Sequence, residues 1–193
     1  MGKPAVFIDR DGTINEQMGY INHISRFHLL SGAAEGIGLL NRSGCLAIVV
    51  SNQSGVARGY FPIDLVERIH EHMRGLLEKE NAFLDGVFFC PHYERGSVLE
   101  YSVACECRKP GTGLIEKACR MFDVDLDRSY VIGDRLSDVE MALRSNLKGI
   151  LVKTGYGRGE IEYLLPGSPH KPAYIAEGLL HAARWIVKDL DPN

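Results

Sequence analysis

The sequence predicts an α/β protein in which a Rossmann-like parallel sheet is covered by helices on both faces. Short apolar runs alternate along the chain with segments whose apolar residues recur at helical spacing. The run 45–50 is apolar at every position, as expected for a strand buried on both faces. At 193 residues, 45% hydrophobic and 24% charged, the chain is long enough to form a single domain, 1–193, with a sizeable core.

Each element follows from a local pattern. Gly44 ends the first helix, and Pro62 can occupy the first turn of the second. The apolar stripe of that second helix has the 3.6-residue period of an amphipathic helix and consists of Val66, Ile69, Met73, Leu76 and Leu77. The predicted helices cover 33–42, 62–77, 114–122, 136–145 and 176–189. The predicted strands are 5–8, 45–50, 86–89, 130–132 and 149–152.

Composition excludes several classes of partner. The net charge of −3 gives no general attraction to nucleic acid or to an anionic membrane surface. No apolar run approaches the roughly 18 residues that cross a membrane, and the first residues lead into a strand rather than a signal peptide. We therefore expect a cytoplasmic protein with a small-molecule partner and, because no heptad pattern is sustained, a monomer. The segment 155–171 is expected to be flexible, and residues beyond 155 carry no motif.

Two carboxylates, Asp9 and Asp11, stand at the carboxyl end of the first predicted strand. Ligands bind at this edge of open parallel sheets. One carboxylate can act there as a nucleophile while the other transfers a proton. Taken alone, Asp-x-Asp-Gly-Thr also fits an acidic turn or a simple cation site.

Groups suited to a phosphate appear after the second strand and before the third helix. Ser51 and Asn52 follow run 45–50, where a hydroxyl and backbone N–H groups can hold an anion. An ordinary polar turn is the alternative. Arg108 offers a fork for oxygen groups and Lys109 a compact point charge, although as a surface pair they would be unremarkable.

Further carboxylates follow the strand 130–132. Asp134 comes directly after it and, together with Asp9, could hold a hard cation through oxygen ligands. Asp138 could join them, or it could be an acidic residue in the first turn of a helix, where the helix dipole favours it.

The order Asp-x-Asp, Ser, Lys, Gly-Asp-x-x-x-Asp over 6–138 resembles the haloacid dehalogenase superfamily of aspartate-nucleophile phosphatases. The resemblance implies that Asp9 attacks phosphorus to give an aspartyl-phosphate. Asp11 would protonate the leaving oxygen and then take a proton from water. The resemblance also implies that Mg²⁺ is held by Asp9, the backbone carbonyl of Asp11 and Asp134. Ser51 and Lys109 would bind the phosphoryl oxygens, and Lys109 and Mg²⁺ would neutralise the charge that gathers there.

A Cys₃His set lies within the loop 90–107. Three thiolates and one imidazole suit tetrahedral Zn²⁺ in a closed structural site, with free cysteines or a disulfide as the alternatives. Zinc would stiffen the loop that delivers Arg108 and Lys109. Cys45 and Cys119 are expected to be small core residues. The four predicted zinc ligands are Cys90, His92, Cys105 and Cys107.

With this loop, the chain is similar to the D-glycero-D-manno-heptose 1,7-bisphosphate 7-phosphatase family, whose zinc loop is shared with histidinol-phosphate phosphatase. The stretch 52–59, the pair Gly19-Tyr20 and the length of the zinc loop favour the heptose family. The implied reaction is Mg²⁺-dependent removal of the 7-phosphate. The resemblance places around the substrate Gln17, Met18, Gly19, Tyr20, Ser51, Asn52, Gln53, Ser54, Arg108, Lys109 and Arg135.

Spacing predicts that no cap domain covers the site. Too few residues separate Thr13 from the first helix to fold as a cap. Specificity would then come from the loops 16–28, 53–61 and 90–108. Arg108 and Arg135 could contact a second phosphate of the substrate, since a guanidinium pairs well with phosphate oxygens.

Two other functions remain open. One is a histidinol-phosphate phosphatase or a broader sugar-phosphate phosphatase. The other is a zinc-bearing interaction or nucleic-acid module on an inactive scaffold, against which the acidic balance and the complete motif set argue. The remaining histidines predict no metal site, because His70 and His72 point to different sides of a helix. All of them are expected to be solvated: His23, His28, His70, His72, His170 and His181.

Overall fold

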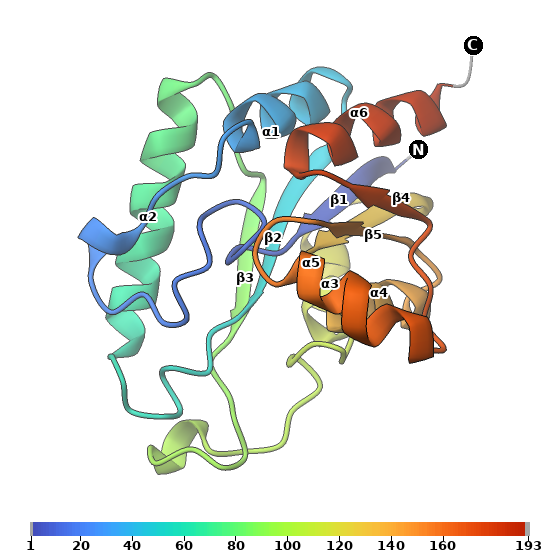
Figure 1. Ribbon diagram of the computed structural model, residues 1–193. Helices are drawn as coiled ribbons and strands as arrows, with labels where there is room; N and C mark the ends of the chain where they lie inside the picture. Colours follow the sequence, from blue (N-terminus) through green and yellow to red (C-terminus); the bar gives the residue numbers. More distant parts are fainter. Residues whose placement is uncertain (1, 192–193) are drawn as a thin grey trace.

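The computed structural model describes residues 2–191 and contains a six-stranded sheet in the order β3-β2-β1-β4-β5-β6. Every pairing in it is parallel. The predicted α/β class is therefore confirmed (Figure 1). The strands are β1 (Lys3–Ile8), β2 (Leu46–Asn52), β3 (Gly86–Cys90), β4 (Val124–Gly133), β5 (Lys148–Val152) and β6 (Tyr174–Ala176).

Helices cover both faces of this sheet (Figure 1). Because side chains alternate along a strand, Val6 and Ile8 of β1 join the core beneath α1, α2 and α6. Phe7 joins the opposite core, beneath α3 and α4. The longer helices are α1 (Ala33–Arg42), α2 (Ile63–Lys79), α3 (Gly113–Met121), α4 (Leu136–Arg144) and α6 (Leu179–Leu190).

The strand order fixes where a ligand can bind. The chain runs outward from β1 through β2 to β3, then returns to the other side of β1 and continues through β4 to β6. Ile8, the last residue of β1, is paired with Val49 of β2 and Ile132 of β4. Such a reversal opens a crevice at the carboxyl ends of the central strands. The motifs after β1, β2 and β4 all lie at this edge.

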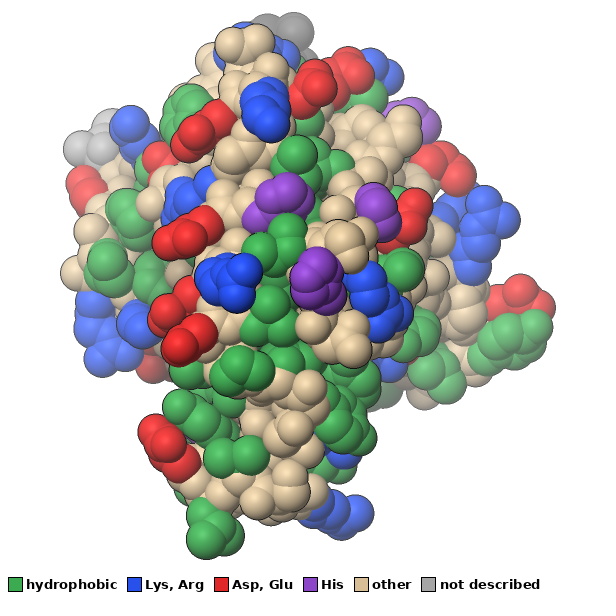
Figure 2. All heavy atoms as spheres, turned by 90° about the vertical axis from the view of Figure 1, so that its left-hand side faces the viewer, with side chains coloured by type: hydrophobic (Ala, Val, Ile, Leu, Met, Phe, Trp, Pro, Cys, Tyr) green, Lys and Arg blue, Asp and Glu red, His purple; other side chains and the backbone are tan. Residues whose placement is uncertain are grey.

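The second helix is amphipathic, as predicted. It starts after Pro62 and buries Val66, Ile69 and Met73. The molecular surface on the side of α2 carries charged and histidine side chains (Figure 2). The prediction that His70 is solvated is wrong, because it lies on the buried side of α2 with only 6% of its surface exposed.

The structure departs from the predicted elements mainly toward the carboxyl terminus. β4 begins at Val124 rather than 130, because its pairing with β1 continues past a register shift into residues of mixed polarity that are mostly partly or fully exposed. The helix predicted from 176 begins at Leu179, and Ala176 instead ends the short strand β6 at the sheet edge. The segment 155–171, expected to be flexible, contains three short helical turns: α5 (Gly157–Gly159), the π-helical η3 (Glu160–Leu164) and the 3₁₀-helical η4 (Leu165–Gly167).

Two further 3₁₀ turns lie in loops at the carboxyl edge of the sheet, η1 (Ile24–Arg26) and η2 (Leu99–Tyr101). Among residues 2–191, no helix is both long and apolar enough to cross a membrane.

Candidate active site

The first pair of carboxylates lies where β1 ends. The backbone N–H of Asp9 still donates to the carbonyl of Ile132, at 2.9 Å, so Asp9 is held firmly against β4. Gly12 then turns the chain with a φ of +86°. A Cβ on Gly12 would lie 2.2 Å from Oδ2 of Asp134. Glycine is therefore required here, both for the backbone conformation and for the close approach of Asp134.

The side chain of Lys109 contacts Asp9 at the end of β1. Its Nζ lies 2.6 Å from a carboxylate oxygen of Asp9 and 2.6 Å from one of Asp138. It also donates to the carbonyl of Val50 at 3.0 Å. Asn52 holds the Lys109 backbone on both sides, donating to its carbonyl at 3.2 Å and accepting from its N–H at 3.0 Å. The ammonium is thus fixed by three buried acceptors.

Three buried carboxylates face this single ammonium. Oxygens of Asp9, Asp134 and Asp138 lie within 4.8 Å of one another. Burial raises the pKa of Asp9 to about 6, even though Lys109 opposes the change. Burial, with Asp9 and Asp138 nearby, raises the pKa of Asp134 to about 8. Burial alone would lower the pKa of Lys109, but Asp138 and Asp9 raise it above its usual range. The cluster carries more negative charge than Lys109 can neutralise.

This donor set fits a hard divalent cation. Oδ1 of Asp134 is buried and has no hydrogen-bond partner, while its Oδ2 accepts from the N–H of Tyr156 at 2.8 Å. An oxygen left unpaired beside two more carboxylates is the ligand that Mg²⁺ prefers. Asp138 also has the helical role considered above, since its Oδ2 accepts from the backbone N–H of Arg135 at 3.1 Å in a capping box of α4.

Asp11 faces the pocket from a different environment. Arg10 donates to both of its oxygens, at 2.9 and 2.7 Å, while Asn15 donates at 3.0 Å and Gln53 at 2.8 Å. Burial would raise the pKa of Asp11, but the charge and hydrogen bonds of Arg10, with those of Asn15 and Gln53, bring it below its usual value. Two carboxylates separated by one residue therefore have their pKa values moved in opposite directions by their surroundings, Asp9 upward and Asp11 downward.

Arg10, which donates to Asp11, and His70, which contacts Arg10, were not predicted from the sequence to belong to the site. Arg10 shares the face of Val6 and Ile8 and is 1% exposed. Its Nη1 lies 3.2 Å from Nε2 of His70. Burial, together with the Arg10 charge, lowers the pKa of His70 to about 3, so the ring is neutral. The helical period held the missing signal, because His70 lies four residues after Val66 of the buried stripe.

The pocket at this edge collects most of the predicted site residues. Met18 packs instead against the core. Ser51 and Gln53, at 1% and 5% exposure, are buried next to the lining residues Asn52 and Asp11 rather than among them. Ser137 and Tyr156 line the pocket without having been predicted, since Ser137 stands at an unspecified position of Gly-Asp-x-x-x-Asp and Tyr156 lies outside every motif. The full lining is Asp9, Asp11, Gln17, Gly19, Tyr20, Asn52, Ser54, Arg108, Lys109, Asp134, Arg135, Ser137, Asp138 and Tyr156.

The loops around the pocket contact one another directly. The Tyr20 and Tyr60 rings meet edge to face with centroids 4.8 Å apart. The carbonyl of Ala57 accepts from the backbone N–H groups of Ser97 and Val98, at 2.8 and 2.9 Å. These contacts join loops 16–28, 53–61 and 90–108 into one rim.

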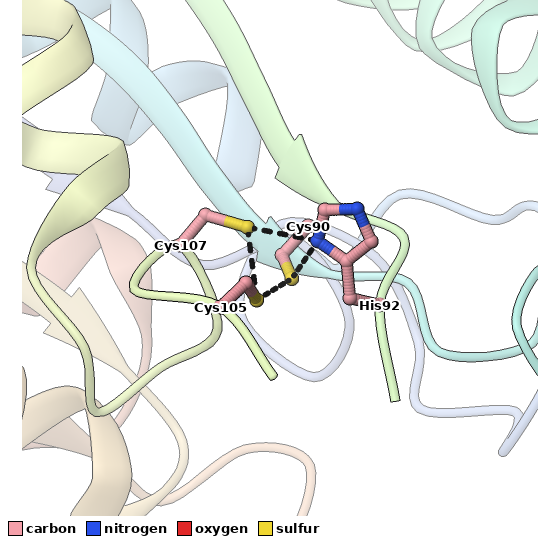
Figure 3. A group of neighbouring side chains, drawn as sticks. All are labelled: Cys90, His92, Cys105 and Cys107. Carbon is pink, nitrogen blue, oxygen red and sulfur yellow. Dashed lines mark hydrogen bonds between the residues drawn. The ribbon is translucent and has the colours of Figure 1, made fainter. Parts of the chain in front are cut away.

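The predicted zinc ligands also meet in one place (Figure 3). The Sγ atom of Cys105 lies 3.5 Å from that of Cys90 and 3.2 Å from that of Cys107. Nδ1 of His92 lies 3.3 Å from Sγ of Cys107 and 3.7 Å from Sγ of Cys90. Ligands around a tetrahedral Zn²⁺ are separated by about 3.6–3.8 Å, so small shifts would accommodate the ion. All five cysteines are free thiols.

Comparisons with known proteins agree with this geometry. A HAD-hydrolase-like family model matches residues 106–182. The D-glycero-D-manno-heptose-1,7-bisphosphate 7-phosphatase of Thermosynechococcus vestitus is 40% identical, over 100% of this chain and 100% of its own. The D-glycero-beta-D-manno-heptose-1,7-bisphosphate 7-phosphatase of Escherichia coli K12 is 40% identical, over 98% of this chain and 96% of its own.

A solved structure of a heptose bisphosphate phosphatase is also similar to this chain. The D,D-heptose 1,7-bisphosphate phosphatase of B. bronchiseptica, complexed with magnesium and phosphate, superimposes with a TM-score of 0.84 at 27% identity. The match covers 96% of this chain and 99% of that one.

The parallel sheet, the Asp-x-Asp pair and the buried lysine define a phosphatase of the haloacid dehalogenase type. Full-length similarity narrows this class further. The chain belongs to the D-glycero-D-manno-heptose-1,7-bisphosphate 7-phosphatase family.

Proposed function

We propose that this enzyme removes the 7-phosphate of D-glycero-D-manno-heptose 1,7-bisphosphate, giving the 1-phosphate and inorganic phosphate. The observation that carries the substrate is the 40% identity with named relatives over the whole length of the chain. The arrangement of Asp9, Asp11 and Lys109 supports the reaction type.

In the first step of the proposed reaction, a carboxylate oxygen of Asp9 attacks phosphorus as the bond to the C7 oxygen breaks. Asp11 donates a proton to that leaving oxygen. In the second step a water attacks the phosphorus of phospho-Asp9 and gives a proton to Asp11, while the bond from phosphorus to the Asp9 carboxylate breaks. Lys109 and the Ser51 hydroxyl bind the phosphoryl oxygens throughout, so that both transition states meet preorganised donors.

Mg²⁺ would be held by Asp9, the backbone carbonyl of Asp11 and Asp134. The ion supplies positive charge against which the phosphoryl oxygens and the attacking carboxylate can approach one another. The unpaired oxygen of Asp134 and the surplus of carboxylates support this proposal.

The other end of the substrate would lie against the joined loops. Arg108 and Arg135 line the pocket and offer guanidinium groups to the distal phosphate. Gln17, Gly19 and Tyr20 line it from the first loop. The distal phosphate gives the site a means of distinguishing a bisphosphate from a monophosphate.

Cys90, His92, Cys105 and Cys107 would hold a structural Zn²⁺. Arg108 follows the last ligand directly and donates to the carbonyl of His92 at 3.3 Å, so the ion would fix the arginine from both sides. Reduced, metal-binding cysteines suit the cytoplasm, which we propose as the location of a monomeric enzyme.

The test is kcat/KM measured side by side on heptose 1,7-bisphosphate, fructose 1,6-bisphosphate and histidinol phosphate, with Mg²⁺ present. The heptose substrate is expected to be preferred, and Asp9→Asn should abolish phosphate release from it. Equal kcat/KM on all three substrates would remove the heptose assignment. Activity that survives Asp9→Asn would instead refute the assignment of Asp9 as the nucleophile.

A further inference from the structure

A chain of buried polar side chains ends at Ser51, and the other members of the chain take no part in the reaction as proposed above. It consists of His70 on α2, Arg10 after β1, Gln53 after β2 and Ser51 at the end of β2. Their exposed fractions are 6%, 1%, 5% and 1%, respectively. Polar groups buried to this extent are held by specific partners, and here the partners are one another and Asp11.

The hydrogen bonds of this chain have a single direction, which Arg10 determines. A guanidinium only donates, so Nε2 of His70, 3.2 Å from Arg10 Nη1, must accept. The second terminal nitrogen, Nη2, donates to Oε1 of Gln53 at 3.2 Å. The amide of Gln53 is thereby oriented with its NH₂ group toward Ser51 and Asp11.

Distances at the other end of the amide agree with that orientation. Nε2 of Gln53 donates to a carboxylate oxygen of Asp11 at 2.8 Å, and a carboxylate can only accept. The same nitrogen donates to Oγ of Ser51 at 2.7 Å. Two neighbours of opposite character, Arg10 and Asp11, therefore fix the same orientation of Gln53.

The consequence falls on the Ser51 hydroxyl. Because its oxygen accepts from Gln53, its single proton remains available for a second partner. Phosphoryl oxygens are acceptors and need that proton. If the Gln53 amide were reversed, Ser51 would donate to Gln53 and would present only lone pairs to the phosphate.

We propose that His70, Arg10 and Gln53 are positioning residues that fix the Ser51 hydroxyl as a hydrogen-bond donor to the transferred phosphoryl group. The proposal rests on the phosphatase function above, in which Ser51 contacts that group. His70 keeps the Arg10 fork in place by accepting from its outer nitrogen, and Phe89 packs edge to face against the His70 ring with centroids 5.3 Å apart.

The experiment measures the affinity of the Mg²⁺-loaded enzyme for inorganic phosphate by isothermal titration calorimetry. The four proteins are the wild type, Gln53→Met, Ser51→Ala and the double variant. Gln53→Met leaves Arg10 and Asp11 paired with each other, so no buried charge loses its partner. We expect each single variant to weaken phosphate binding about tenfold, and the double variant to bind no more weakly than Ser51→Ala alone.

The double variant separates this role from a merely structural one. If Gln53 acts through Ser51, its replacement has no further effect once the hydroxyl is gone. Losses that multiply in the double variant would overturn the proposal. A change of less than about twofold in Gln53→Met would overturn it as well.

His70 gives a second, independent set of variants. The His70→Gln variant keeps an acceptor for Arg10, so its phosphate affinity should be unchanged. The His70→Leu variant has no acceptor, so its phosphate affinity should fall severalfold. His72→Leu is the matched control on the same helix, since His72 packs against Phe27 and should leave binding unchanged. Equal losses in both His70 variants would overturn the role of that residue.

These titrations use phosphate alone and contain no sugar. An enzyme that prefers another sugar phosphate would therefore refute the heptose substrate and leave the positioning role standing. Conversely, correct heptose activity with additive losses in the double variant would refute the positioning role alone.

Discussion

Replacing Lys109 with Met tests how much the buried ion pairs contribute to the fold. The side chain is 3% exposed and its ammonium contacts Asp9 and Asp138, both at 2.6 Å. Removing one partner of a buried ion pair leaves uncompensated charge and costs about 3–5 kcal/mol. For a domain of this size, that predicts a melting temperature lower by roughly 6–20 °C. The kcat should also fall on the order of 10²–10³-fold, because a phosphoryl-binding donor is lost.

The measurement is urea denaturation of both proteins without divalent cations, with phosphate release followed separately in Mg²⁺. Lys79→Met, at an exposed position in the last turn of α2, is the control and should change stability by no more than about 0.5 kcal/mol. A loss below about 1 kcal/mol in Lys109→Met would refute the reasoning, since the pairs would then behave like exposed salt bridges.

Three further predictions concern pH, zinc and the distal phosphate. The pKa values of Asp9 and Asp134 are raised from 3.8 to about 6 and about 8. Protonation of these groups stabilises the fold below about pH 4, and this contribution is lost as the pH rises through 6 to 8. Without metal, these two groups should lower the melting temperature as the pH rises from 5 to 8. Thermal scans should also show that Mg²⁺ raises the melting temperature more at pH 8 than at pH 6. A larger Mg²⁺ effect at pH 6 would contradict this. Cys107→Ser should lose copurified zinc in elemental analysis together with kcat/KM, and zinc-free folded wild type would contradict the loop assignment. Arg108→Met should raise KM for a sugar bisphosphate about tenfold and leave KM for a monophosphate unchanged; equal changes on both would exclude a contact with the distal phosphate.

The site could be predicted from the sequence because its residues follow buried strands. Apolar runs mark β1, β2 and β4, and parallel strands bring the residues after them to one edge. Asp9, Ser51 and Asp134 could therefore be placed together without coordinates. The predicted zinc ligands could be grouped for a similar reason, since all four lie within the short segment 90–107.

Features that depend on tertiary packing could not be predicted in this way. β6 has three residues and no apolar pattern distinct from the helix that follows it, and only pairing with β5 makes it a strand. The first half of β4 alternates Val124 and Leu126 with charged residues and is only partly buried, so it lacks the continuous apolar run that marked the other central strands.

His70 was missed for a different reason. Its place in the buried stripe of α2 was visible, but a histidine there is stable only because Arg10 donates to it from beneath the sheet edge. Arg10 stands between two carboxylates in the sequence, and no role was predicted for it. The contact between these two residues, 60 positions apart, could be recognised only from the structure.

The central claim is that Asp9 is the nucleophile and Asp11 the group that releases the intermediate. The most direct measurement uses Asp11→Asn with p-nitrophenyl phosphate, whose leaving group needs no proton, so that the first step proceeds while the second is slowed. We predict a burst of nitrophenolate equivalent to the enzyme present, followed by slow turnover. Borohydride reduction of the trapped phosphoenzyme should convert residue 9 to homoserine. A variant with no burst, or a reduced residue other than Asp9, would contradict the account.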